Sequence, residues 1–251
     1  MTHELRFLTR RTAGRMLGGV KRTPTRVRNW DRFWRDYNRY RRLESDEHRR
    51  AVHLIVPYVE DATGTTVIEP IYFYQDAWAF ERIVARRPAR HIDVGSHHKY
   101  VALLSKVVPT TMVDLRPFSL PLDSLEFIEG SILELPFADQ SLESISCLCV
   151  VEHIGLGRYG DELDPNGSEK AIAELVRVVA SDGRLYFSVP VGREHVVAFN
   201  AARSFPRDYL LEQLVPLELV EERYIVGDVF QETYADGPPF AVTGLFELRR
   251  P

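Results

Sequence analysis

The sequence predicts an α/β protein in which a helical N-terminal extension precedes a doubly wound, mostly parallel, seven-stranded sheet with an antiparallel closing strand. Two observations lead to this prediction. From about residue 88 onward, short apolar runs alternate with turns and helical stretches, a pattern typical of parallel strands joined by crossover helices. The chain has 251 residues and is 45% hydrophobic, which is enough for one large domain with its own core.

Basic residues gather near the N-terminus. Residues 1–50 carry 15 Lys and Arg against 6 Asp and Glu, whereas the remaining residues carry 17 against 30. Residues 1–27 have no sustained apolar period, which predicts a basic flexible arm. Neither a long apolar run nor a signal-peptide pattern occurs, so we expect a cytoplasmic protein, with peripheral contact at the inner face of the membrane as an option.

Residues 28–87 are predicted to form a helical N-terminal extension or lid. In this segment Trp30, Phe33, Trp34 and Tyr37 recur at helical spacing, with arginines on the other faces. The simplest interpretation is a helix that packs on the main domain. The alternatives are a helix on an anionic membrane surface and a contact with a glycan-assembly protein. Nucleic acid is not expected, because the acidic body would repel phosphate.

Residues 88–251 are predicted to form the main domain, with five β/α units and a closing pair of strands. Its expected strands are residues 90–94, 111–115, 125–130, 143–151, 184–190, 217–226 and 241–249. Apolar residues at positions 172, 175, 176 and 179 predict a helix, with Ser168 as a possible N-cap and Gly183 just beyond its end. Pro206 and Pro216 bracket a second, shorter helix.

The two cysteines give no sign of a disulfide or a metal site. Cys147 and Cys149 lie two apart in an apolar run, so their side chains share one face of an extended strand. That geometry does not favour a bridge between them, and no further ligands stand at zinc-site spacing.

A nucleoside site is expected where the first strands of the main domain end. Ligands of open α/β sheets bind at the carboxyl ends of the strands, near the reversal of strand order. The first strand ends at Asp93 and Gly95, and Ser96 can cap the helix that follows. The second strand ends at Asp114, 21 residues after Asp93, a spacing that suits hydrogen bonds to ribose hydroxyls. Either acid alone would be read as the end of a strand, but the pair indicates a ligand.

From about residue 88 to 226 the chain resembles the class I S-adenosylmethionine-dependent methyltransferases. The resemblance rests on the words HIDVGS, VDLRP, GSILELPFADQSLESIS, VVEHIG and KAIAELVRVVASDGRLYFSVPVG. It implies a Rossmann-like fold with S-adenosyl-L-methionine as cofactor. More narrowly, EHIGLGRYGDELDPNGS, YFYQDAW and VGREHVVAFNAAR resemble a bacterial group associated with surface-polysaccharide synthesis. This implies a saccharide, nucleotide sugar or lipid-linked glycan as acceptor.

The resemblance also implies which residues bind the cofactor. They are Asp93, Gly95, Ser96 and His97 at the methionine end, Asp114 at the ribose, Leu115, Ser131 and Ile132 at the adenine, and Val150 and Glu152 beneath the sulfonium. The usual Gly-x-Gly turn is replaced here by Gly95-Ser96-His97-His98. Bulky side chains at this turn either swing outward or fill part of the site.

Residues 152–168 hold more reactive side chains than a connection needs, and they are expected at the carboxyl edge of the sheet. The predicted catalytic residues are His153, Arg158, Tyr159 and Asp161, and the predicted acceptor-binding residues are Tyr74, Gln75, Trp78 and Asp164. His153 could accept the proton of a sugar hydroxyl, and Arg158 could grip a phosphate or carboxylate. The alternative is a structural turn clamped by an Arg158–Asp161 pair, with Trp78 used in helix packing.

Three functions fit these features. The first is methyl transfer to a glycan acceptor. The second is a non-catalytic Rossmann-like module in a polysaccharide assembly complex, which the missing glycines favour. The third is a transferase that uses a sugar nucleotide held by residues 158–164. The fold alone does not choose among them.

Overall fold

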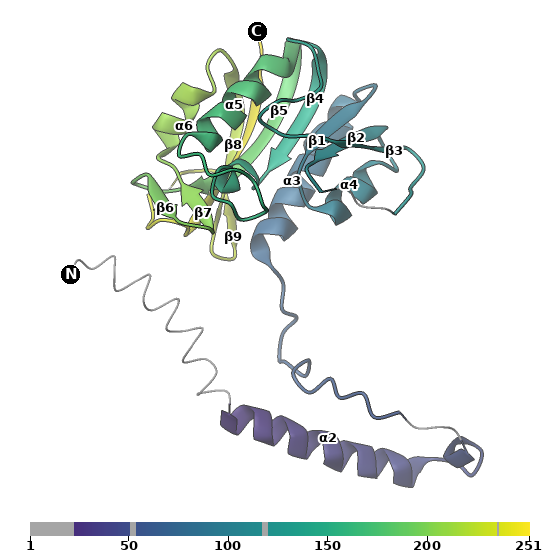
Figure 1. Cartoon of the computed structure of the whole chain (residues 1–251). Helices are drawn as coiled ribbons and strands as arrows, with labels where there is room; N and C mark the ends of the chain where they lie inside the picture. The colour runs from purple at the N-terminus through teal and green to yellow at the C-terminus, as the bar shows by residue number, and fades with distance from the viewer. Residues whose placement is uncertain (1–22, 51–53, 117–119, 235) are drawn as a thin grey trace, which may run out of the picture. The chain divides into compact units, whose positions relative to one another are not determined.

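The computed structural model describes residues 23–50, 54–116, 120–234 and 236–251 (Figure 1). The chain divides into two compact units, Met1–Val67 and Ile68–Pro251. Most of the predicted basic arm, residues 1–22, lies outside the described residues.

The first unit contains the predicted aromatic helix, α2 (Thr23–Leu43), followed by the 3₁₀ turn η1 (His48–Arg50). Along α2 the aromatic rings meet edge to face, with 5.8 Å between the ring centroids of Trp30 and Phe33 and 6.1 Å between those of Trp34 and Tyr37. Trp34 remains 45% exposed. Among the described residues, no helix is both long and apolar enough to cross a membrane.

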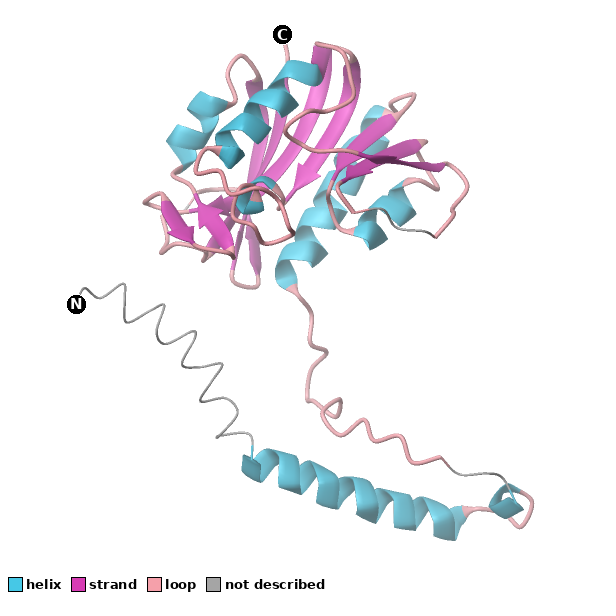
Figure 2. Ribbon diagram, in the orientation of Figure 1, coloured by secondary structure: helices cyan, strands magenta, loops and turns pink. Residues whose placement is uncertain are grey.

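The second unit is built on an eight-stranded sheet in the order β3-β2-β1-β4-β5-β10-β8-β9. Figure 2 draws its strands in magenta. Its strands are β1 (His91–Val94), β2 (Thr110–Asp114), β3 (Leu125–Glu129), β4 (Leu142–Leu148), β5 (Val179–Val191), β8 (Glu218–Val226), β9 (Val229–Gln231) and β10 (Val242–Arg249). The first five are parallel, and β8, β9 and β10 pair antiparallel. All seven predicted strands are present. The sheet has one strand more than the seven predicted. The additional strand is β9, which at three residues is too short to show an apolar pattern.

Helices cover both faces of the sheet (Figure 1). On one face, α5 (Gly167–Val178) and α6 (Arg207–Gln213) join a buried apolar cluster with the strands. On the other, α3 (Pro70–Arg86) and α4 (His98–Leu104) form a second cluster. α3 therefore packs within the second unit, whereas the sequence grouped it with the N-terminal extension. Its apolar stripe is used against the sheet.

The predicted helix near residue 168 is α5, but both of its ends differ from the prediction. Asn166 occupies the N-cap position. Ser168 lies inside the first turn, where its hydroxyl donates to the Val151 carbonyl oxygen at 2.6 Å. At the other end Val179 already belongs to β5. The strand bulges around Gly183, where an added Cβ would lie only 2.7 Å from the Leu142 carbonyl oxygen.

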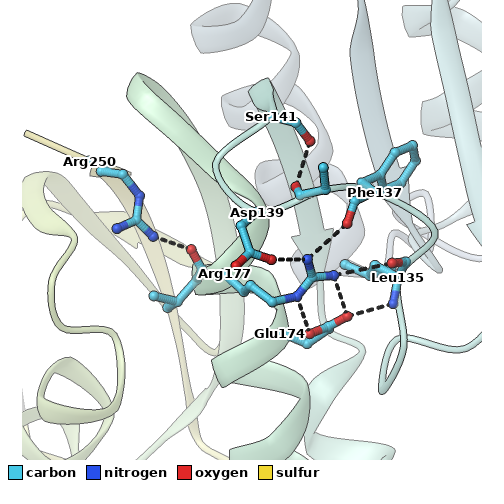
Figure 3. Close-up of polar contacts among 9 residues, drawn as sticks. Leu135, Phe137, Asp139, Ser141, Glu174, Arg177 and Arg250 are labelled. Carbon is cyan, nitrogen blue, oxygen red and sulfur yellow. Dashed lines mark hydrogen bonds and ion pairs between the residues drawn. The ribbon is translucent and has the colours of Figure 1, made fainter.

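Arg177 on α5 holds the loop that leads into β4 (Figure 3). Its guanidinium donates to the Phe137 carbonyl at 2.9 Å, to the Leu135 carbonyl at 3.2 Å and to the Asp139 carboxylate at 2.7 Å. The Glu174 carboxylate accepts from Arg177 and from the Leu135 N–H, each at 2.7 Å. The segments LPFAD and ELVRV, which carry much of the resemblance, are thus joined by hydrogen bonds that stabilise the fold of this chain.

Candidate functional site

The strand order reverses between β1 and β4, so the carboxyl ends of these strands meet next to that of β2. Gly95 follows β1 with φ +68°. A Cβ on Gly95 would lie 3.2 Å from Val150 Cγ1 and 3.9 Å from Asp114 Oδ2. The position therefore needs glycine for its backbone angle and offers little space for a side chain. The structure brings together Gly95, Asp114 and Val150, three of the residues predicted to bind a cofactor.

Asp93 is fully buried and fixes the loop after β1. Its Oδ1 accepts from the Ser96 N–H at 3.1 Å, and its Oδ2 accepts from the Ser146 hydroxyl at 2.6 Å. Burial raises the pKa of Asp93 to about 6, against the opposing effect of these hydrogen bonds. The Ser96 hydroxyl oxygen accepts from the Leu148 N–H at 3.1 Å. In this structure Asp93 and Ser96 hold the loop against β4, since their polar atoms are already engaged.

Asp114 ends β2 with one carboxylate oxygen in use. Oδ1 accepts from the Arg116 N–H at 2.8 Å and lies 3.7 Å from Arg116 Nε. Oδ2 accepts no hydrogen bond from any described residue. Leu115 beside it is 42% exposed. The pair is therefore placed to offer an acceptor and an apolar surface to a ligand.

The turn after β3 adjoins this strand end. The Gly130 N–H donates to the Asp114 carbonyl oxygen at 3.1 Å, which brings Ser131 and Ile132 beside β2. The Ser131 hydroxyl accepts from the Leu133 N–H at 3.1 Å, and Ile132 is only 6% exposed. Ser131 thus shapes this turn, and Ile132 belongs to the core.

The rings of the histidine pair after Gly95 lie against each other, with 4.5 Å between their centroids. The ring of His97 lies 5.0 Å from that of Tyr72 on α3, and its Nδ1 lies 4.0 Å from Asp76 Oδ2. Burial, with His98 next to it, lowers the pKa of His97. Burial also raises the pKa of Asp76 to about 6. His98 is exposed at the start of α4. The loop therefore fits its bulky residues by turning His97 toward α3.

Glu152 presents a buried carboxyl group just beyond β4, in the 3₁₀ turn η2 (Val151–His153). It is 2% exposed, and its Oε2 has no hydrogen-bond partner among the described residues. Burial raises its pKa to about 8, although its own backbone and the Cys149 thiol oppose the shift. The pKa of Tyr72 is raised by burial and by the nearby Cys149, Tyr159 and Glu152. Glu152 is thus a group that can take up a proton at this edge of the sheet.

His153 is tied to the turn between β6 (Val196–Ala198) and β7 (Ala202–Ser204). Its Nδ1 lies 2.6 Å from the Ala201 carbonyl oxygen, which can only accept, so the proton belongs on Nδ1. Arg158 Nη1 donates to the same carbonyl at 2.9 Å and lies 3.1 Å from His153 Nδ1 and 3.4 Å from Nε2. Burial and then Arg158 lower the pKa of His153 to about 4. A base this weak does not suit the predicted role in proton removal.

The Arg158–Asp161 clamp that we considered is not formed. The Asp161 carboxylate accepts from the N–H groups of Gly155 at 2.7 Å and Tyr159 at 3.2 Å. Although burial acts to raise the pKa of Asp161, these backbone donors hold it below its usual value. The Asp161 carboxylate therefore stabilises the conformation of the loop in which it lies. Asp164 is likewise engaged, since its Oδ2 accepts from Lys170 at 2.7 Å.

The aromatic residues predicted to cover an acceptor mostly serve packing. Tyr74 stacks on Phe230 with 5.3 Å between centroids and donates to the Asp228 carbonyl at 3.2 Å. Trp78 is 4% exposed and meets Tyr186 edge to face in the core. Gln75 is fully buried and accepts from the Ser188 hydroxyl at 2.7 Å. Each side chain points from α3 into the sheet or toward β9. In this structure Tyr74, Gln75 and Trp78 are therefore engaged in packing and hydrogen bonds within the protein.

Sequence reasoning missed Arg203, which holds residues 152–168 in place from β7. This side chain is 2% exposed. Its Nη1 donates to the Ile154 carbonyl at 2.5 Å and to the Ser168 hydroxyl at 2.9 Å, and its Nη2 donates to the Asp164 carbonyl at 3.2 Å. A single arginine among small and apolar residues gave no signal of this role, because its burial depends on the whole fold.

Sequence reasoning also missed Asp76, which lies on α3 beside His97, and Arg116, which follows β2. In the described part of the chain, no three His, Cys, Asp or Glu side chains are grouped to hold a metal ion.

Two solved structures share this fold. The N-methyltransferase NodS from Bradyrhizobium japonicum, in complex with S-adenosyl-L-homocysteine, aligns at TM-score 0.51 and 16% identity over 72% of this chain and 88% of that chain. A putative methyltransferase from Bacillus halodurans aligns at TM-score 0.52 and 17% identity over 70% of this chain and 99% of that chain. At such identities the likeness shows the Rossmann-like fold.

Sequence comparison gives less. Residues 126–215 match the family model "Caenorhabditis protein of unknown function, DUF268". No curated protein matches the chain.

Proposed function

We propose that this chain is an S-adenosyl-L-methionine-dependent methyltransferase. The observation that carries the proposal is the meeting of Gly95, Asp114 and Val150 where the strand order reverses. This is the edge at which doubly wound sheets bind their ligands. The fold shared with two methyltransferase structures supports the same assignment.

The residues present fit this cofactor. Gly95 provides a backbone that a Cβ would obstruct, next to the free Oδ2 of Asp114. That oxygen can accept a hydrogen bond from a ribose hydroxyl, with exposed Leu115 beside the base. When bound, the cofactor supplies an electrophilic methyl group on a sulfonium. The chain then has to orient the acceptor and receive its proton.

Glu152 is the residue that we propose as proton acceptor, in place of His153. With a pKa of about 8 the carboxyl group is mostly protonated at pH 7, so its ionised fraction, which grows as the pH rises toward 8, is the form that acts as the base. Its unpartnered Oε2 can accept a hydrogen bond from an incoming hydroxyl. As the acceptor oxygen takes the methyl group, the bond between sulfur and methyl would break to leave a neutral thioether, and the hydroxyl proton would pass to the ionised Glu152 carboxylate. His153, with its Nδ1 proton held by Ala201, positions the loop instead.

For the acceptor we propose a saccharide, nucleotide sugar or lipid-linked glycan of surface-polysaccharide synthesis. The resemblance of residues 152–168 supports this choice. So does the 39% exposed ring of Tyr159, because aromatic rings offer an apolar surface to a sugar while their hydroxyl stays polar. We propose further that the protein works at the cytoplasmic face of the membrane, with its basic N-terminus in peripheral contact.

Calorimetry with S-adenosyl-L-methionine and S-adenosyl-L-homocysteine tests the assignment. We expect micromolar binding to the wild-type protein and a loss of at least about tenfold in Asp114→Ala, since each tenfold step is about 1.4 kcal/mol. Asp208→Ala, which removes an exposed carboxylate on α6, is the control and should bind as the wild type does. Absence of binding to the folded wild type would reject the proposal. Preference for a sugar nucleotide would favour the transferase alternative.

A further inference from the structure

Two arginines share one exposed aromatic ring at the carboxyl edge of the sheet. The guanidinium carbon of Arg116 lies 4.3 Å from the ring centroid of Tyr159, and that of Arg158 lies 5.1 Å from it. Arg116 follows β2, whereas Arg158 belongs to the loop after η2. Two segments far apart in the sequence therefore bring two positive charges to one place.

Both guanidinium groups keep donors that the protein does not use. Arg158 donates through Nη1 to Ala201 and His153, and its Nη2 and Nε have no hydrogen bond among the described residues. No carboxylate of the residues that the structure describes lies within ion-pair distance of Arg158. Arg116 has one, Asp114 Oδ1 at 3.7 Å from its Nε, which is too long for a hydrogen bond. Both guanidinium groups, with their unused donors, therefore lie close to the ring of Tyr159.

The arrangement is electrostatically incomplete without a ligand. Each guanidinium is attracted to the ring, but two like charges near the same ring repel each other. The Arg158 anchor on a backbone carbonyl holds it there, although no acid neutralises it. A guanidinium presents a planar fork of donors that matches phosphate and carboxylate oxygens. An anion bound by the two arginines would offset the repulsion and use their free donors.

We infer that Arg116, Arg158 and Tyr159 form a binding site for an anionic group, a phosphate or a carboxylate, on the acceptor. The inference rests on the proposed function, since it assigns the anion to the methyl acceptor. The assignment follows from position, because Arg116 adjoins Asp114 at the proposed cofactor site. It narrows the substrate class to acceptors that carry a negative charge, such as a sugar phosphate or a uronic acid. Tyr159 would contact the ring attached to that group.

The test uses probes that avoid the nucleoside site. Inorganic pyrophosphate and galacturonate are titrated into the full-length protein at low salt, with neutral galactose as the uncharged comparison. We expect one anionic probe to bind, with at least about tenfold weaker binding in Arg158→Gln and in Arg116→Gln, and weaker binding at higher salt. Arg158→Lys, which keeps the charge but not the fork, should restore part of the affinity.

A matched control separates this site from general charge. Arg249→Gln removes an exposed arginine that pairs with Glu218 at 2.7 Å at the end of β10, and it should bind the probe as the wild type does. S-adenosyl-L-homocysteine is titrated into the same samples, and Arg158→Gln should retain its affinity for it.

The outcomes distinguish the two proposals. Equal probe binding in wild type, Arg116→Gln and Arg158→Gln overturns the anion site, as does an absence of anion binding in a protein that binds S-adenosyl-L-homocysteine. Arginine-dependent anion binding without S-adenosyl-L-homocysteine binding supports the anion site and rejects the methyltransferase assignment. Preference for pyrophosphate or for galacturonate identifies which anion the acceptor carries.

Discussion

Glu152 shows how one buried carboxyl group links function with pH-dependent stability. Its pKa rises from 4.5 to about 8 on folding because it is buried. Between these values the folded protein holds a proton that the unfolded chain has released. The free energy of unfolding therefore falls as the pH rises through this window, by up to about 1.4 kcal/mol for each pH unit.

We predict that Glu152→Gln removes this contribution. The variant should gain stability relative to the wild type as the pH is raised from about 5 to about 8, as measured by urea unfolding across that range. Asp93 and Asp76 are also raised, to about 6, and they act in the same direction in both proteins. Glu143→Gln, an exposed substitution on β4, is the control. Parallel stability curves for Glu152→Gln and wild type would show that Glu152 does not titrate in this window.

A second prediction at this scale concerns Gly95. Gly95→Ala should lower stability by roughly 1–2 kcal/mol, because a side chain is disfavoured at positive φ. It should also weaken S-adenosyl-L-homocysteine binding by at least about tenfold, because its Cβ lies 3.2 Å from Val150 and faces Asp114. Calorimetry measures the affinity, and thermal unfolding measures the stability.

Gly227→Ala is the matched control for Gly95→Ala. Gly227 has φ +63°, but no atom lies within 4 Å of its added Cβ. It should show the cost of backbone strain with unchanged affinity. If the two variants bound the ligand equally well, the approach of Gly95 to the cofactor would be disproved.

At the scale of elements, β7 holds the loop of residues 152–168 through Arg203. Arg203→Met would leave the carbonyl groups of Ile154 and Asp164 and the Ser168 hydroxyl without this donor. We expect a loss of about 2–4 kcal/mol in the free energy of unfolding, since buried acceptors without partners are costly. Limited proteolysis should begin within the loop. Arg249→Met is the exposed control, and a loss as small as that of the control would contradict the clamp.

The aromatic face of α2 leads to a prediction about membranes. A larger fraction of the full-length protein should co-sediment with vesicles that contain anionic lipid than with neutral vesicles. The reason is that basic residues surround exposed aromatic rings on α2. Replacing Trp30 and Trp34 together by Ser should reduce the bound fraction several-fold. Tyr58→Ser, at a residue that is 74% exposed outside α2, should not. Equal binding to both vesicle types would exclude this role.

At the scale of the whole molecule, residues 68–251 contain both apolar clusters. We predict that this fragment folds without residues 1–67, with a melting temperature within about 5 °C of the full chain, because a unit with its own core is stable by itself. Its affinity for S-adenosyl-L-homocysteine should be unchanged. A fragment that aggregates, or that folds but loses binding, would show that the N-terminal residues complete the domain.

The sequence by itself determined the succession of elements and the positions at which strands end. Alternating apolar runs located β1, β2 and β4, and the spacing between Asp93 and Asp114 indicated where a nucleoside would lie. These predictions were possible because they depend on neighbours along the chain. The ends of α5 were less accurate, since pairing of Val179 with Leu142 decides where the helix stops.

Only the tertiary structure decided which side chains are free for chemistry. Trp78 and Tyr74 are aromatic residues of the kind that bind a sugar, but the fold uses them in packing. Glu152 and Arg116, in contrast, keep polar atoms that are available to a ligand. The position of β10 between β5 and β8 and the burial of Arg203 likewise follow from contacts across the fold. The physical reason is that burial, pKa and charge pairing depend on residues far apart in the sequence, and local patterns carry no record of those distances.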